Sequence, residues 1–326
     1  MSEDIAVAAV ASDADSANGR LMRRATYAAV AVAGTLVVVK LVAYVLTGSV
    51  ALLSSLIDSA LDSAASIVNL IAVRHALQPA DEEHRFGHGK AEPLAGLGQA
   101  AFITGSSVFL LFEAASRLWD PQPVTQGWVG IAVMIFAIVA TIGLVLYQKH
   151  VVSRTNSIAV NADSLHYTGD VLINVSVIVS ILLSTLAGFP YADPIFAIGI
   201  AAYLLWNAKG IFLSSLDLLM DREFEEEDRE KILAIAREHP MVHDAHDLRT
   251  RSSGQQQFIQ LHLELGRNLT LVKAHAIAEQ VERQIREVFP QADVLIHQDP
   301  VGIVEEHHDD LAYQDKVLEP GEVPKE

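Results

Sequence analysis

Long apolar segments alternate with short polar loops over the first two-thirds of the chain. Six of these segments are long enough to cross the roughly 30 Å apolar core of a bilayer as helices. They comprise residues 27–46, 50–73, 94–112, 128–147, 164–186 and 194–212. The fifth is a weaker prediction by hydropathy, because it opens with Asp163, His166 and Asp170. The pattern predicts an all-α, six-helix transmembrane domain over residues 23–221.

Residues 222–303 show the shorter patterns of a small soluble domain. Helices are predicted at residues 225–238, whose acidic start suits a helix N-terminus, and at residues 271–288, which carry an apolar seam at helical spacing. Strands are predicted at residues 244–251, 258–265 and 293–299. In the second strand, apolar and polar residues alternate as on a strand with one buried face. The order αββαβ predicts a cytoplasmic α+β domain of the ferredoxin-like or metallochaperone-like type.

Composition agrees with a membrane protein that has a soluble part. Hydrophobic residues make up 51% of the chain and charged residues 19%, below the roughly 25% of soluble domains. The net charge of −17 is concentrated in the ends of the chain and around residues 223–230, and it argues against nucleic acid as a partner. Residues 1–22 and 304–326 are predicted to be disordered tails. The N-terminus lacks the basic region and apolar core of a cleaved signal peptide.

The positive charges of the loops predict the orientation. Arginines precede the first apolar segment, and the loops after the second and fourth segments also carry Lys or Arg. Of the three opposite loops, only one has a basic residue, Arg117, at its edge. By the positive-inside rule, both termini are expected in the cytoplasm.

Two pairs of polar residues stand out within the apolar segments. Asp58 and Asp62 are the only acidic residues of segment 50–73, and they share one helical face because they are four residues apart. An aspartate in the bilayer centre costs about 2.5–3.5 kcal/mol on insertion scales, so such a pair indicates a functional site. His166 and Asp170 have the same spacing. Two helices that each offer two ligands can build a four-ligand N/O site, which suits Zn²⁺. The alternatives are a soluble helix with two solvated acids and a satisfied core histidine.

Two further groups of residues could bind metal. Asp81, His84 and His88 can converge on one ion at a membrane edge, although a charged, glycine-containing turn would show the same pattern. In the soluble domain, five ligand-type residues indicate one ion or a bridged pair: His246, His262, His275, His297 and Asp299. His239, His243, His307 and His308 are interpreted as surface residues. Because the chain has no cysteine, thiolate sites are excluded and Cu(I) is disfavoured.

Five short motifs link these groups. They are Asp58-xxx-Asp62, His-Arg-Phe-Gly-His-Gly-Lys-Ala-Glu at residues 84–92, His166-xxx-Asp170, Ala-His-Asp-Leu-Arg-Thr-Arg at residues 245–251 and Ile-His-Gln-Asp-Pro at residues 296–300. In this order they resemble the cation diffusion facilitators, in particular the bacterial YiiP-type zinc/iron efflux pumps. The resemblance runs from about residue 23 to residue 301 and leaves both tails outside it.

The resemblance implies a role for each group. It implies that Asp58, Asp62, His166 and Asp170 form a transport site of the kind found in the Zn²⁺, Cd²⁺ or Fe²⁺ branch. It implies a second ion on Asp81, His84 and His88, and a binuclear site on the five cytoplasmic ligands with Asp299 as a bridge. Relatives are homodimers joined through their cytoplasmic domains. Their charge interlock between the membrane and cytoplasmic parts would fall here on Lys90 and Asp221.

The hypothesis is a secondary transporter, not an enzyme: a proton-coupled antiporter that exports divalent metal ions from the cytoplasm by alternating access. It would be a multi-pass protein of the bacterial inner membrane, with lipid, protons, metal ions and a second copy as partners. Zn²⁺ is the favoured substrate, and Cd²⁺ or Fe²⁺ are alternatives. The same ions would serve as structural or regulatory ions in the cytoplasmic domain, where they would stabilise the dimer or bias transport.

Three other functions remain open at this point. A membrane-anchored metal sensor would keep the soluble cluster but has no need of Asp58 and Asp62 in the bilayer. A membrane metalloenzyme needs an open coordination position and a general base, and the chain has no His-Glu-x-x-His signature. Uptake in place of efflux is also possible, because motifs do not fix the direction of transport.

Overall fold

The computed structural model describes residues 2–119, 128–187 and 191–302. The chain divides into two compact units. The first contains Met1–Phe224 with the segments Thr250–Phe258 and Pro290–Asp293. The second contains Glu225–Arg249, Ile259–Phe289 and the chain from Val294 onwards.

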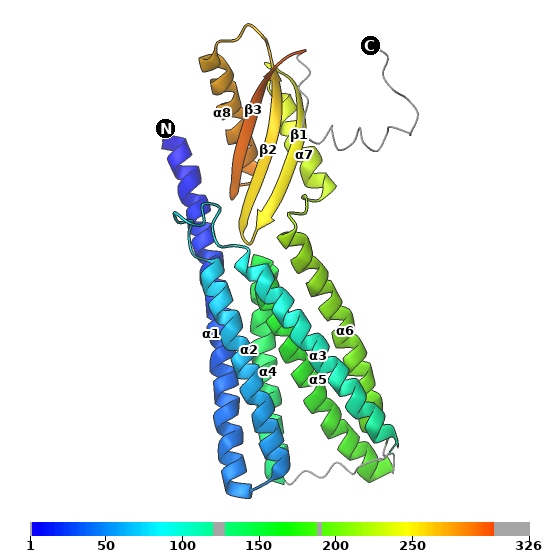
Figure 1. Cartoon of the computed structure of the whole chain (residues 1–326). Helices are drawn as coiled ribbons and strands as arrows, with labels where there is room; N and C mark the ends of the chain where they lie inside the picture. The colour runs from blue at the N-terminus through cyan, green and yellow to red at the C-terminus, as the bar shows by residue number, and fades with distance from the viewer. Residues whose placement is uncertain (1, 120–127, 188–190, 303–326) are drawn as a thin grey trace, which may run out of the picture. The chain divides into compact units, whose positions relative to one another are not determined.

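Six long helices form the first unit (Figure 1). They are α1 (Ser2–Thr47), α2 (Val50–Ala76), α3 (Ala91–Trp119), α4 (Trp128–Thr155), α5 (Ile158–Ala187) and α6 (Ala192–Leu219). Each contains a stretch long and apolar enough to cross a membrane. Large apolar side chains such as Val45, Phe109 and Trp206 are exposed on them, as expected for surfaces that face lipid. The prediction of six membrane helices is confirmed.

The helices extend beyond the predicted segments, most clearly at the N-terminus. Helix α1 begins at Ser2, where the sequence predicts a disordered tail over residues 1–22. The physical reason is local: residues 2–18 are rich in alanine, the best helix former, and contain neither glycine nor proline. Hydropathy marks the part of a helix that lies in lipid and does not mark where the helix ends. The predicted tail at residues 304–326 lies outside the described residues.

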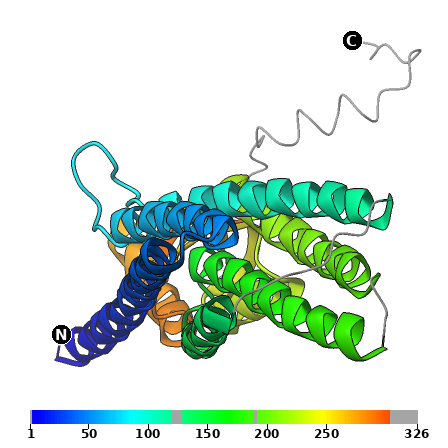
Figure 2. The same ribbon diagram turned by 90° about the horizontal axis from the view of Figure 1, so that it is seen from below.

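The six helices of the first unit pack against one another in pairs. Helix α3 packs mainly on α6, α1 on α2, and α4 on α5, and the view along the bundle shows these neighbours (Figure 2). Gly96 permits the α3–α6 approach, because a Cβ there would lie 2.5 Å from Ser215 Oγ and 2.6 Å from a methyl group of Ile158. Small residues at such crossings are typical of membrane helix pairs.

A buried carboxylate fixes the start of α5. Glu92 of α3 is 3% exposed and accepts hydrogen bonds from Ser157 Oγ (2.5 Å) and from the backbone N–H of Ala159 (3.4 Å). An anion is stabilised at a helix N-terminus by the unpaired N–H groups and the helix dipole. The contact ties α5, which carries His166 and Asp170, to α3.

The soluble domain has the predicted αββαβ order. Its elements are α7 (Glu226–Glu238), β1 (Val242–Ser253), β2 (Gln256–Leu265), α8 (Leu271–Val288) and β3 (Ala292–Pro300). The sheet order is β1-β2-β3, with β2 in the centre. Gly254, at φ +61°, supplies the left-handed residue of the β1–β2 turn. Strand β2 runs parallel to β3, because the N–H of Gln257 bonds the carbonyl of Gln291, and the N–H of Val301 bonds that of Leu265.

Alternation on β2 agrees with the sequence pattern. Ile259, Leu261, Leu263 and Leu265 are all at most 3% exposed. Polar residues, among them His262, therefore lie on the opposite face of the sheet. Because the apolar face is the buried one, the ligand-type side chains of the strands meet on the other face.

Candidate metal centres

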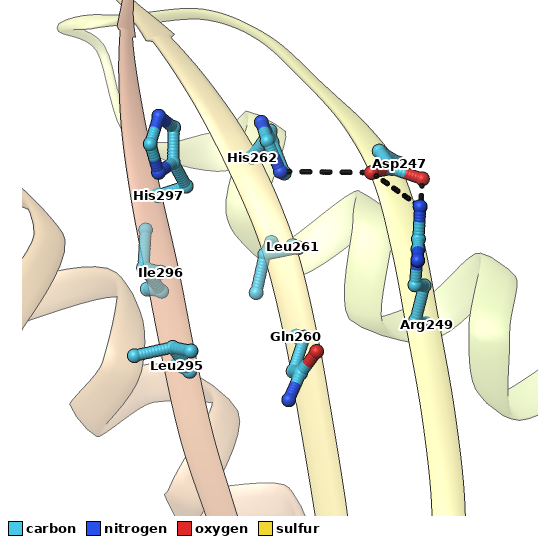
Figure 3. A pocket seen from close by; sticks show the side chains of 8 residues that line it. All are labelled: Asp247, Arg249, Gln260, Leu261, His262, Leu295, Ile296 and His297. Atoms are coloured by element: carbon cyan, nitrogen blue, oxygen red, sulfur yellow. Dashed lines mark hydrogen bonds and ion pairs between the residues drawn. The ribbon is translucent and has the colours of Figure 1, made fainter. Parts of the chain in front are cut away.

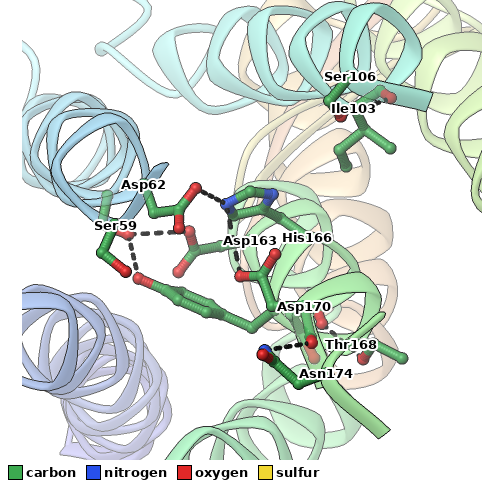
Figure 4. A network of polar contacts seen from close by, with 12 residues as sticks. Ser59, Asp62, Ile103, Ser106, Asp163, His166, Thr168, Asp170 and Asn174 are labelled. Carbon is green, nitrogen blue, oxygen red and sulfur yellow. Dashed lines mark hydrogen bonds and ion pairs between the residues drawn. The ribbon is translucent and has the colours of Figure 1, made fainter. Parts of the chain in front are cut away.

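Three ligand-type side chains meet inside the helical unit. Asp62 comes from α2, and His166 and Asp170 come from α5 (Figure 4). His166 Nε2 lies 3.0 Å from Asp62 Oδ1 and 3.9 Å from Asp170 Oδ2. One ligand atom of each residue lies within 4.8 Å of the others. One nitrogen and two carboxylates at this spacing fit a small divalent ion such as Zn²⁺.

Asp58, the fourth predicted ligand, is not part of this cluster. It lies one helical turn before Asp62 and lines the same cavity. The structure thus brings together three of the four residues predicted for the transport site.

The cavity holding the cluster has a volume of about 720 Å³. Its lining follows α3 from Phe102 to Glu113, about 16 Å along a helix. The cavity therefore extends from the cluster toward the C-terminal end of α3. There Arg117 donates to Glu113 Oε1 (2.9 Å) and to Asp193 Oδ2 of α6 (2.8 Å).

Lys40 and Asp163 are further polar groups near the cluster. Lys40 lines the cavity and donates to Ser59 Oγ (2.6 Å) and to the Ser55 carbonyl (3.1 Å). Asp163 is fully buried and accepts from Gln148 Nε2 at 2.7 Å. Sequence analysis gave Asp163 no role, although residues 163, 166 and 170 share one helical face. The spacing of Asp163 from His166 could have indicated its place beside the cluster. Its partner Gln148 lies on another helix, α4, so no pattern in the sequence indicated that contact.

The loop between α2 and α3 brings the second predicted group together. Asp81 Oδ1 lies 3.3 Å from His84 Nδ1, and Asp81 Oδ2 lies 3.3 Å from His88 Nε2. The backbone N–H groups of His84 and Glu83 bind the Asp81 carboxylate, which lowers the pKa of that carboxyl. Asp81 is therefore ionised at neutral pH and suited to a cation.

In the soluble domain, one carboxylate collects three histidines from three strands. Asp299 Oδ2 lies 2.8 Å from His262 Nδ1 and 3.5 Å from His246 Nε2. Asp299 Oδ1 lies 3.0 Å from His297 Nε2. The two oxygens thus face different histidines, as a carboxylate that bridges two ions would. The side chain of Asp299 is only 5% exposed.

His275 lies apart from this site, and Asp247 lies beside it. His275 on α8 is exposed and lies 3.4 Å from Glu279, so a single chain does not place it with the other four predicted ligands. Asp247, which sequence analysis did not select, has φ 45° and an Oδ2 atom 3.6 Å from His262 Nε2. It lines a cavity of about 330 Å³ with His262 and His297 (Figure 3).

Lys90 and Asp221, predicted as a charge interlock, form an ion pair. Lys90 Nζ lies 2.9 Å from Asp221 Oδ1 and also donates to the Leu219 carbonyl (3.4 Å). The pair joins the residue before α3 to the residues that follow α6. Because both side chains are more than a third exposed, it contributes at most about 1 kcal/mol to stability.

Comparison with known proteins gives matches over almost the whole chain. Residues 26–220 match the cation efflux transmembrane domain, and residues 224–301 match the cation efflux protein cytoplasmic domain. The cation-efflux pump FieF of Klebsiella pneumoniae is 48% identical over 286 residues, covering 88% of this chain and 95% of the pump. FieF of Cronobacter sakazakii is 49% identical with the same coverage.

A solved structure of CzrB in its Zn form resembles only a quarter of the chain. It is 28% identical and covers 26% of this chain and 99% of its own, with a TM-score of 0.25. The assignment therefore rests on the sequence matches to both domains. The protein is a transporter of metal cations rather than an enzyme, and it belongs to the cation diffusion facilitator family.

Proposed function

We propose that this pump exports Zn²⁺, with Cd²⁺ or Fe²⁺ as alternative substrates, in exchange for protons. The observation that carries the proposal is the cluster of Asp62, His166 and Asp170 in a cavity of the helical unit. A metal sensor would have no need of this cluster, because charged groups inside a membrane are costly and persist where they serve a function. Asp58 is proposed as the fourth ligand.

Proton coupling follows from the chemistry of the ligands. Imidazole and carboxylate bind metal only when deprotonated, so metal affinity falls as pH falls. Protons that reach the cavity would compete for His166 and the aspartates and release the ion. In the proposed orientation, with both termini in the cytoplasm of a bacterial cell, the C-terminal end of α3 faces outward. The cavity toward Glu113 would then be the exit path.

The other two centres are proposed to bind metal outside the transport path. Two ions would lie on either side of Asp299, held by His246, His262 and His297, with His275 as the predicted further ligand. They would stabilise a homodimer formed by the cytoplasmic domains. The loop centre would hold one ion on Asp81, His84 and His88. We also propose that the Lys90–Asp221 pair restrains the cytoplasmic ends of α3 and α6 as the interlock.

The direction of transport can be tested in bacterial cells that lack their own zinc exporters. Cells that express the chain should contain less zinc than cells with an empty vector, as measured by elemental analysis after zinc exposure. A His166→Ala variant at equal expression should behave like the empty vector. A higher zinc content would indicate uptake, and no difference for Zn²⁺, Cd²⁺ or Fe²⁺ would contradict the proposed substrates.

A further inference from the structure

The loop centre contains a third imidazole that the predicted ligand set does not include. His75, in the last turn of α2, places its ring centroid 4.6 Å from that of His88, edge to face. The ring of His84 lies at the same centroid distance, 4.6 Å, from His88. His88 thus lies in contact with two other histidines and with Asp81. The end of α2 and the loop that follows it thus bring three imidazoles and one carboxylate together.

His88 is buried in a manner unusual for a residue between two glycines of a polar loop. Its side chain is 4% exposed, and Nε2 points to the Asp81 carboxylate. Its Nδ1 is buried and has no hydrogen-bond partner among the described residues. A metal ion coordinates one nitrogen of an imidazole ring, so an ion beside the Asp81 carboxylate would bind His88 at Nε2 and hold the ring in this buried position.

We infer that His75 is a fourth ligand of the loop centre, which would then bind one Zn²⁺ through three histidines and Asp81. The inference rests on the loop centre of the proposed function. Zn²⁺ in closed sites is four-coordinate, and Asp81, His84 and His88 supply only three ligands. The side chain of His75 is exposed, so a change of its rotamer can bring a ring nitrogen to the ion without moving a packed core.

A fourth protein ligand would change what the loop centre does. A site with three ligands keeps an open position that can pass an ion on, whereas a closed site holds it. Because His75 belongs to α2, a closed site would also tie the end of the helix that carries Asp62 to the start of α3. Occupancy by metal would then restrain a helix of the transport cluster.

The test uses the full chain in detergent, in a parent variant that keeps only the loop centre. The substitutions Asp62→Asn, Asp170→Asn, His262→Ala and Asp299→Asn remove the other two clusters. Zn²⁺ binding is measured by competition with a chelating dye, and the imidazoles around the ion are counted by X-ray absorption. The parent should bind one ion with three imidazoles. Adding His75→Gln should leave two imidazoles and weaken binding at least about tenfold, since even outer-shell partners are worth 10–100-fold.

Two controls separate the outcomes. His150→Gln removes an exposed histidine near the end of another helix, α4, and should change neither readout. His84→Gln should weaken binding as His75→Gln does. If His75→Gln retains the parent's affinity and imidazole count, the inference is wrong while the loop centre stands. If the parent binds no ion, the loop centre and the role of His75 both fall, whereas zinc export by the wild type would still support the transport site.

Discussion

The Asp62→Ala variant will bind one divalent ion fewer per chain than the wild type. Asp62 is the only residue of α2 within the cluster, and its carboxylate lies 3.0 Å from His166 Nε2. Without it, only His166 and Asp170 of the cluster remain, besides the proposed ligand Asp58, and affinity at the transport site should fall by more than about 100-fold, because outer-shell partners alone are worth 10–100-fold. Equilibrium dialysis with Zn²⁺ counts the ions.

The matched control is Glu113→Gln. Glu113 is a carboxylate that lines the same cavity, but it pairs with Arg117 far from the cluster. This variant should bind as many ions as the wild type, with nearly unchanged affinity at the transport site, because exposed charges separated by more than a Debye length of about 10 Å are largely screened. Asp58→Ala decides whether the fourth predicted ligand binds the ion. An unchanged ion count in Asp62→Ala would mean that the cluster is not a binding site.

Zinc will protect strand β2 of the cytoplasmic domain from hydrogen exchange in the wild type but not in Asp299→Ala. Asp299 is the one carboxylate of the described domain that touches His246, His262 and His297 together. A ligand at 100 times its dissociation constant stabilises the state that binds it by about 2.7 kcal/mol. Removing the bridge should abolish most of this protection. The measurement is exchange of β2 peptides with zinc and with a chelator.

Gln260→Ala is the control for this prediction. Gln260 lines the same cavity on the same strand but offers no imidazole or carboxylate. It should retain zinc-dependent protection. Equal protection in Asp299→Ala would contradict the binuclear site. Transport by a His262→Ala/His297→Ala variant then separates the two roles of the metal: a folded domain with unregulated transport indicates a sensor, and an unfolded domain indicates a structural ion.

The sequence allowed prediction of those parts of the site that depend on local spacing. Asp62, His166 and Asp170 could be found because each lies at i, i+4 spacing from another ligand type in an apolar segment. The face of β2 that carries His262 followed from simple alternation, because the opposite residues are all apolar. In both cases the signal lies within a single element, where periodicity determines which side chains share a face.

Contacts between distant elements could not be predicted in this way. Asp163 receives its hydrogen bond from Gln148 on α4, and Glu92 binds the start of α5 through Ser157. In both cases the donor and the acceptor lie on different elements, so the spacing of residues within one helix does not reveal the contact. His75 lies thirteen residues before His88, and only the fold of the loop between α2 and α3 brings the two rings together. The N-terminal part of α1 was not predicted, because hydropathy identifies only the part of a helix that lies in lipid.

The central claim is proton-coupled metal transport through the Asp62–His166–Asp170 cluster. The most direct test is zinc flux into proteoliposomes with an acidic interior, first with the pH gradient imposed and then with it collapsed by an ionophore. The wild type should accumulate zinc only while the gradient exists, and Asp62→Ala should accumulate none. Equal zinc flux in both proteins, or wild-type flux that stays the same when the pH gradient is collapsed, would contradict proton-coupled transport through the cluster.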